Sequence, residues 1–201
     1  MLVLIMSEVK NEIRVLGVDD GPFDKFRDKK CLVTATVFRG GIYMDGLLSC
    51  HVDVDGNDAT DKLVKLIKKS RHLGQLKIVM INGIAFAGFN VIDISQVHRN
   101  TRLPVIVIIR HKPNLKKIEN ALRISDMRTA KRKMSMIKRA GKIHQLDVRG
   151  KRIYFQTAGL DEKTARQIIL LTSTHGSIPE PLRISHMISS GIVLGESHTR
   201  A

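Results

Sequence analysis

The chain has few cysteines and few aromatic residues, and each shortage excludes a class of protein. Cys31 and Cys50 are the only cysteines among 201 residues, with no Cys-X-X-Cys pair and no Cys/His cluster at zinc spacing, so no structural zinc site is expected. Free thiols on predicted strands are typical of a reducing compartment, and we expect a cytoplasmic protein. Aromatic residues make up 4% of the chain and tryptophan is absent, which argues against an aromatic platform for stacked single-stranded bases.

Long apolar runs are lacking as well. No stretch approaches the length of a membrane span, and the opening MLVLIM is shorter than the core of a signal peptide. We therefore expect no membrane partner. With 43% hydrophobic residues, the chain can fill the core of a single domain over residues 1–201, and we expect flexible ends at 1–11 and 195–201.

Acidic residues are scarce relative to basic ones, and the net charge is +15. Fifteen Lys and Arg but three acids lie between residues 110 and 152, so most of the excess charge is in this segment. Such a field attracts polyanions, of which nucleic acid is the usual one, although a solvated basic helix face is the alternative. The predicted nucleic-acid-binding residues are Arg39, Lys112, Lys116, Lys117, Arg128, Lys131, Arg132, Lys133, Lys138 and Arg139.

The order of the predicted elements indicates an α/β domain. Apolar alternation, tight turns and helical apolar stripes divide the chain into strands and helices. The strands are expected at 13–19, 31–39, 42–54, 76–81, 103–110, 143–148 and 152–157, and the helices at 57–72, 90–100, 114–140 with a break near Ser125, 161–172 and 182–190. A three-strand meander followed by alternating helices and parallel strands is the order of the ribonuclease H-like mixed sheet.

Acidic side chains stand where predicted strands end. Asp19 and Asp20 close the first strand, and Asp53 and Asp55 share one face near the end of the third. Carboxylates at such ends hold magnesium in two-metal nucleases, because this hard ion prefers oxygen ligands. The alternatives are ordinary turn carboxylates and, for Asp58, a helix N-cap.

Asn82 closes the strand LKIVMI, which we expect beside the first strand. Its amide oxygen can coordinate magnesium but adds no negative charge, so metal affinity should be lower than with a carboxylate; the alternative is a turn Asn before Gly83. The predicted catalytic residues are Asp19, Asp20, Asp55 and Asn82, with Asp19, Asp55 and Asn82 as metal ligands and Mg²⁺ as the cofactor. For His175 and His186, near the last helix, we favour a structural role over proton transfer.

The strings IRVLGVDDGPF, VFRGG, VDGNDAT and INGIAFAGFNVIDI resemble an archaeal family known as domain of unknown function 99. That family is similar in fold to endonuclease V, a ribonuclease H-like enzyme that uses magnesium to cut nucleic acid near deaminated adenine. The resemblance places Asp19 on the catalytic Asp of the first strand and Asn82 on the second catalytic Asp, from which it departs. The nearest candidates for the catalytic glutamate of endonuclease V are Asp53 and Asp55.

Three functional hypotheses follow. The leading one is an endonuclease V-like nucleic-acid-binding protein, with magnesium-dependent phosphodiester hydrolysis as the candidate reaction. The second is a binding module that keeps the fold and the basic segment but has lost hydrolysis, as Asn82 would favour. The third is a structural subunit whose basic segment docks an acidic partner protein.

Overall fold

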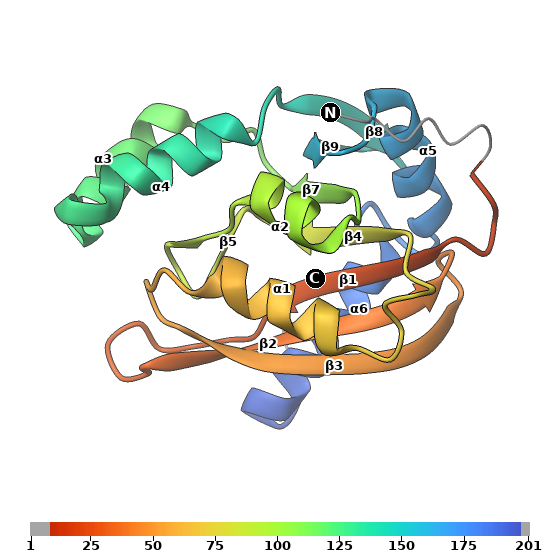
Figure 1. Ribbon diagram of the computed structural model, residues 1–201, viewed down its shortest axis with the longest axis horizontal. Coiled ribbons are helices and arrows are strands. Elements are labelled where there is room, and N and C mark those ends of the chain that lie inside the picture. The colour runs from red at the N-terminus through yellow and green to blue at the C-terminus, as the bar shows by residue number, and fades with distance from the viewer. Residues whose placement is uncertain (1–8, 198–201) are drawn as a thin grey trace.

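Seven strands form one mixed sheet at the centre of the molecule, as the computed structural model in Figure 1 shows for residues 9–197. Residues 1–8 and 198–201, which include most of the predicted flexible ends, lie outside the described residues. The strand order is β3-β2-β1-β4-β7-β9-β8, with β1, β4 and β7 parallel and the other neighbours antiparallel. The strands are β1 (Arg14–Asp20), β2 (Lys30–Arg39), β3 (Tyr43–Asp53), β4 (Ile78–Asn82), β7 (Val105–Ile109), β8 (His144–Val148) and β9 (Lys151–Ala158). The predicted meander and the parallel strands that follow it are confirmed.

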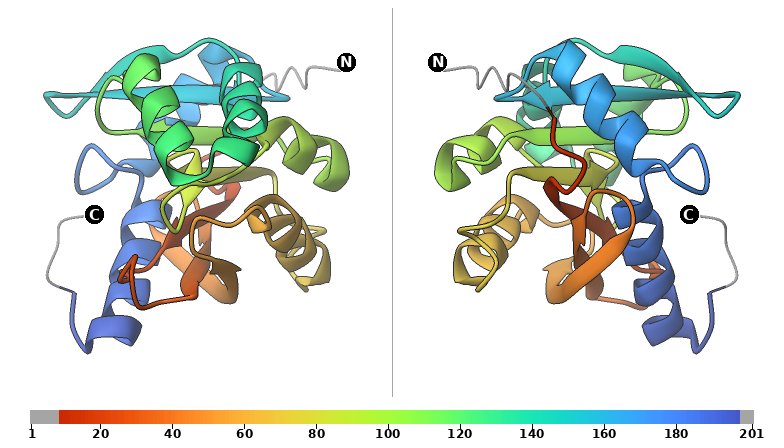
Figure 2. Two further views of the ribbon diagram at one scale, coloured as in Figure 1. Left: turned by 90° about the vertical axis from the view of Figure 1, so that its left-hand side faces the viewer. Right: turned by 90° about the vertical axis from the view of Figure 1, so that its right-hand side faces the viewer.

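Helices cover both faces of this sheet, because side chains alternate along each strand. On β1, Leu16 and Val18 belong to the core beneath α1 (Ala59–Lys69) and α2 (Ile94–Thr101), whereas Val15 faces the core beneath α5 (Glu162–Thr172) and α6 (Glu180–Leu194). Figure 2 shows the two pairs of helices on opposite sides. Among the described residues, no helix has the length and apolar character needed to cross a bilayer.

The basic helical segment forms an arm that projects beyond the sheet (Figure 1). It consists of α3 (Leu115–Ser125) and α4 (Met127–Arg139), and the predicted break falls between them. Asp126 ends α3 and begins α4, where its carboxylate accepts a hydrogen bond from the backbone N–H of Arg128. This side-chain cap explains why the helix is interrupted at that residue.

The segment after β4 differs from the prediction of one helix over 90–100. A small hairpin of β5 (Ala85–Phe86) and β6 (Asn90–Val91) comes first, and α2 starts at Ile94 behind an Asp93 N-cap. The side chain of Asn90 fixes β6, because its Oδ1 accepts from the N–H of Ala59 and its Nδ2 donates to Asp53 and Asp58. These partners are more than 30 residues away in sequence, so a local helical pattern gives no sign of them.

Helix α6 lies unusually close to β1. A Cβ built on Gly17 would fall 2.4 Å from the Cβ of Pro181, so only glycine allows this approach. The hydroxyls of Thr34 and Thr36 on β2 donate to the carbonyls of Ser185 and Pro181, at 2.9 and 2.7 Å. The start and the middle of α6 are thereby fixed against the strands that lead to the Asp pair.

Candidate active site

The carboxyl ends of β1, β4 and β7 meet at one edge of the sheet, since the three strands are parallel and adjacent. Asp19 and Asp20 end β1, Asn82 ends β4, and Arg110 follows directly after β7. These four residues line a cleft of about 590 Å³, together with His186 of α6. Ligands of open α/β sheets bind outside the carboxyl ends of the strands, which makes this cleft the candidate active site.

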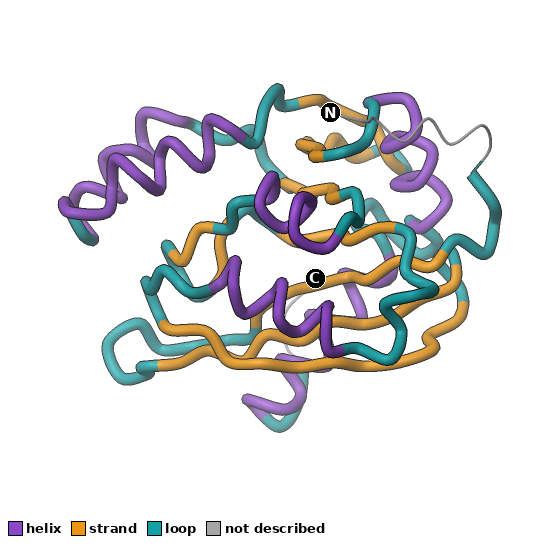
Figure 3. The backbone as a smooth tube through the Cα atoms, viewed as in Figure 1, coloured by secondary structure: helices purple, strands orange, loops and turns teal. Residues whose placement is uncertain are grey.

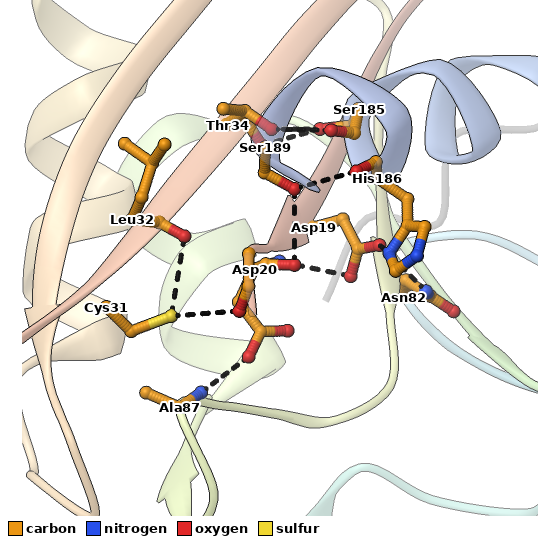
Figure 4. Close-up of polar contacts among 11 residues, drawn as sticks. Asp19, Asp20, Cys31, Leu32, Thr34, Asn82, Ala87, Ser185, His186 and Ser189 are labelled. Atoms are coloured by element: carbon orange, nitrogen blue, oxygen red, sulfur yellow. Dashed lines mark hydrogen bonds and ion pairs between the residues drawn. The ribbon is translucent and has the colours of Figure 1, made fainter. Parts of the chain in front are cut away.

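Asp19 is the most enclosed acid of the cleft, with 2% of its surface exposed. Its Oδ2 accepts a hydrogen bond from Asn82 Nδ2 at 3.0 Å and lies 3.0 Å from His186 Nδ1, while its Oδ1 accepts from the backbone N–H of Asp20 (Figure 4). Because an ionised carboxylate only accepts hydrogen bonds, Nδ1 of His186 carries the hydrogen. A buried carboxylate needs such partners to offset its desolvation.

Asp20 lies beside Asp19 but has a different environment. Its Oδ2 accepts a hydrogen bond from the N–H of Ala87 at 2.7 Å, which ties the end of β1 to the loop after β4. Burial, and then repulsion by the adjacent carboxylate of Asp19, raises the pKa of Asp20 to about 6. The negative charge of Asp20 is therefore not fully compensated by the protein.

The prediction from sequence assigned His186 no part in this site. The imidazole lies 167 residues from Asp19 along the chain, and it reaches the acid because α6 packs tightly on β1. A glycine inside a buried strand often marks the close approach of another backbone, so Gly17 was the available signal. Arg110 was also absent from the predicted site, although its place directly after a buried parallel strand could have indicated it.

Asp55 lies outside the cleft lined by Asp19 and Asn82. Its Oδ1 accepts from the N–H of Phe89 at 2.8 Å, and its Oδ2 lies 3.3 Å from Lys25 Nζ. Its backbone N–H donates to the carbonyl of Ala87, and the N–H of Ala87 donates to Asp20. The backbone of Ala87 therefore connects Asp55 to Asp20. The role of Asp55 as a metal ligand stays a prediction.

Asp58 occupies the N-cap position of α1, but its carboxylate does not cap the helix. Instead, Oδ1 accepts from the backbone N–H of Asp53 at 3.1 Å and from Asn90 Nδ2 at 2.6 Å. The expected N-cap hydrogen bond is therefore wrong, because the β6 asparagine competes for the acid. Asp58 stabilises the loop that carries Asp55.

The predicted basic residues divide into two groups. Lys112, Lys116, Lys117, Lys131 and Lys138 are exposed on or near the arm, as is Arg128, which also pairs with Asp126. Four others are held by the protein: Lys133 is 2% exposed and donates to the carbonyl of Asp55, Arg132 donates to Asn57, Arg139 pairs with Asp93, and Arg39 pairs with Asp45. Burial directs the ammonium of Lys133 inward, so this residue anchors α4 and does not present its charge to a ligand.

The arm and the loop that joins β1 to β2, residues 21–29, project from the same end of the molecule (Figures 1 and 3). Figure 2 shows them on either side of the β5–β6 hairpin when that end faces the viewer. The cleft lies at the strand ends between them, because Asp20 directly precedes the loop and Arg110 lies shortly before α3. A strand bound in the cleft would therefore have cationic side chains within reach on the arm.

The sequence and structure comparisons with known proteins agree on one family. Residues 11–193 match the sequence family described as endonuclease dU. A UPF0215 protein of Methanothermobacter thermautotrophicus is 45% identical, with 96% of this chain and 94% of the relative covered. A crystal structure of a protein of unknown function from Archaeoglobus fulgidus is 38% identical, with a TM-score of 0.81 over 90% of this chain and 98% of that one.

A more distant structure shows how widely the fold is shared. Endonuclease V of Ciona intestinalis, in complex with a DNA that contains an inosine followed by a ribo-adenosine, superimposes with a TM-score of 0.57 and 13% identity. The match covers 90% of this chain and 84% of that protein. At this identity the likeness concerns the fold, and it confirms the endonuclease V-like architecture.

Proposed function

Since this chain belongs to the endonuclease dU family, we propose that it hydrolyses phosphodiester bonds of nucleic acid in the cleft around Asp19, Asp20 and Asn82. The observation that carries the proposal is the buried Asp19 carboxylate, which His186 and Asn82 hold at the carboxyl ends of parallel strands. A structural role alone does not require a second carboxylate, Asp20, at the same edge, where its charge is costly.

The residues of the cleft fit a hard divalent cation. Two carboxylates and an amide supply oxygen atoms, which is the ligand chemistry that Mg²⁺ prefers. Burial and the adjacent Asp19 carboxylate raise the pKa of Asp20, and a bound cation would offset both effects. We propose Asp19, Asp20 and Asn82 as the residues that would hold Mg²⁺ through their side-chain oxygen atoms. When bound, Mg²⁺ supplies activation of water and stabilisation of the leaving oxygen.

The chain's own residues have separate tasks in this proposal. His186 orients Asp19 through the Nδ1 hydrogen bond, so that the carboxylate is fixed before substrate arrives. Arg110 lines the same cleft, and we assign it the recognition of a substrate phosphate, a role that suits the guanidinium group. The exposed lysines of the arm contribute charge for the rest of the strand.

The chemistry of the substrate follows from what the relatives are named for. The family description carries the term dU, and the Ciona endonuclease V complex holds a DNA with inosine. Uracil and hypoxanthine are the bases left when cytosine and adenine lose an amino group. We propose a nucleic acid with a deaminated base as the substrate, and a cytoplasmic location consistent with two free cysteines.

A second candidate function is a binding module without hydrolysis. The observation that favours it is the amide of Asn82, whose Nδ2 already satisfies Asp19 without any cation. Among the described residues, no group of three or more His, Cys, Asp and Glu side chains is arranged to hold a metal. Metal affinity in such a site would be low, and the fold would bind nucleic acid through the arm alone.

Cleavage of end-labelled oligonucleotides with dU or inosine separates the two functions. We expect Mg²⁺-dependent cutting by the natural chain and a loss of at least about 100-fold in Asp19→Asn, because one ligand charge disappears while the hydrogen bonds to Asn82 and His186 can be kept. Asn82→Asp should lower the Mg²⁺ concentration needed for half-maximal cutting. A natural chain that binds these strands yet never cuts them in Mg²⁺ or Mn²⁺ would establish the binding module instead.

A further inference from the structure

A second cavity opens beside the active-site cleft. Its volume is about 270 Å³, and it shares Gly83 and Ile109 with the cleft as common walls. Most of the other walls are apolar and come from the arm and its connections, including Leu115, Ile118 and Ile143. Pockets for drug-sized ligands begin at roughly 300 Å³, so this cavity suits a single flat ring system.

Two polar side chains, Lys138 and Gln156, interrupt the apolar walls. Gln156 of β9 lines the cavity and is 3% exposed. Its Nε2 donates to the carbonyl of Gly141 at 2.8 Å, and its Oε1 accepts no hydrogen bond from any residue between 9 and 197. In the described part of the chain only the hydroxyls of Ser173 and Ser190 are both buried and unpartnered, so Gln156 Oε1 is accessible, and a ligand or water in the cavity can donate to it.

The bond to Gly141 fixes which end of the amide faces the ligand. If the amide turned over, its oxygen would meet the carbonyl oxygen of Gly141, and two acceptors would repel each other. Gly141 itself is held, because its N–H donates to the carbonyl of Lys138 at the end of α4. Gln156 therefore presents an acceptor to the cavity and not a donor.

We propose that this cavity receives a nucleobase with an imino N–H, which donates a hydrogen bond to Gln156 Oε1; the inference rests on the proposed nuclease function. Deamination converts N3 of cytosine and N1 of adenine from acceptors into N–H donors, in uracil and in hypoxanthine respectively. The apolar walls cover the faces of the ring once the base has left its stack. Cytosine or adenine would instead place an acceptor against an acceptor.

The amide alone does not separate uracil from thymine or hypoxanthine from guanine, since these bases share the imino N–H. The discrimination assigned to Gln156 is therefore within each deamination pair. Because the two hollows meet at Gly83 and Ile109, this assignment predicts that the chain cuts near the base that is read.

Binding of four single-stranded oligonucleotides, identical except for one central dU, dC, inosine or dA, tests the inference in the Asp19→Asn chain. Fluorescence anisotropy should show about tenfold tighter binding of dU than of dC, or of inosine than of dA, since one hydrogen bond and one acceptor clash separate each pair. Preference in one pair identifies the base that the cavity takes, and preference in both identifies the shared N–H. Equal affinity in both pairs would overturn the inference.

Gln156→Met keeps the volume of the side chain and removes the acceptor. We expect the preference for the deaminated base to fall to within about twofold, with little change in the affinity for dC. Gln167→Met, on the exposed face of α5, should keep the full preference. Thermal unfolding checks that each variant is folded. If Gln156→Met retained the full preference, Oε1 would not read the base.

The nuclease assay distinguishes failure of this inference from failure of the proposed function. A natural chain that cuts in Mg²⁺ but treats dU like dC and inosine like dA supports the proposed function and overturns the reading role of Gln156. A chain that prefers deaminated bases without cutting supports the cavity and overturns hydrolysis. Absence of binding to all four strands overturns both.

Discussion

At the level of single residues, the charge of Asp20 lowers the stability of the folded protein at neutral pH. The pKa of Asp20 is raised to about 6, so in the folded protein this carboxylate takes up a proton more readily than in the unfolded chain, where the ordinary value is 3.8. Between these two values the folded state binds more protons than the unfolded one, and its stability falls as the pH rises. Above about pH 6 the cost is constant.

Asp20→Asn should therefore stabilise the protein at neutral pH. We expect a gain of up to about 3 kcal/mol in the free energy of unfolding at pH 8, shrinking toward zero near pH 4, because the asparagine carries no charge and can still accept from Ala87. Urea denaturation at the two pH values measures the difference.

Asp161→Asn serves as a control, because the pKa of Asp161 is shifted in the opposite direction to that of Asp20. Hydrogen bonds from Thr164 lower the pKa of this N-cap carboxylate, so it stabilises α5 above its ordinary pKa and loses that effect as the pH falls. Its replacement should be mildly destabilising at pH 8. An Asp20→Asn chain that is less stable than the natural one at pH 8 would contradict the assigned environment.

At the level of elements, the contact of α6 with β1 determines where His186 lies. Gly17→Ala would put a methyl group into Pro181, and we expect a loss of about 1–3 kcal/mol in stability and a strong loss of cleavage. Gly191→Ala in α6 is the matched change, because nothing lies within 4 Å of its added Cβ. That variant should be neutral or more stable. Chemical denaturation measures the stability of both variants, and the cleavage assay measures their activity. Equal effects at the two glycines would disprove the close contact.

The elements also show what the sequence can and cannot reveal. Strand β1, the break at Ser125 and the meander followed by parallel strands are local or follow from general rules of connection, and the predictions for them are confirmed. The β5–β6 hairpin was missed, because its stability comes from the side chain of Asn90 in contact with distant residues. Membership of an archaeal family similar to endonuclease V, predicted from four strings, is confirmed.

The candidate site was predicted in part for the same reason. Asp19 and Asn82 come together because parallel neighbours end at one edge, a relation that the order of strands contains. His186 depends on how a helix at the other end of the chain packs, which no local pattern encodes. The inward direction of Lys133 depends on the loop that contains Asp55. The density of basic residues predicted a basic helical segment, but burial determines which of its side chains present their charge at the surface.

At the level of the whole molecule, the arm should supply the salt-dependent part of nucleic-acid binding. Changing Lys116, Lys117 and Lys131 together to alanine should reduce the slope of log affinity against log salt by about two to three for duplex DNA, because each lost phosphate contact removes about 0.9. The same changes at Lys65, Lys68 and Lys69 of α1 should leave the slope nearly unchanged. Affinity titrations between low and moderate salt give both slopes, and equal slopes for the two triple variants would remove the arm from the interface.

The buried Lys133 of α4 connects the arm to the acid at the end of β1 through a series of hydrogen bonds. Lys133 donates to the carbonyl of Asp55, Asp55 donates to the carbonyl of Ala87, and Ala87 donates to the carboxylate of Asp20, at 2.9, 2.8 and 2.7 Å. Lys133 lies at the middle of α4, so three hydrogen bonds connect this helix to the acid at the end of β1. A displacement of α4 would act on the Asp20 carboxylate through these hydrogen bonds, so we expect α4 and the end of β1 to move as one unit.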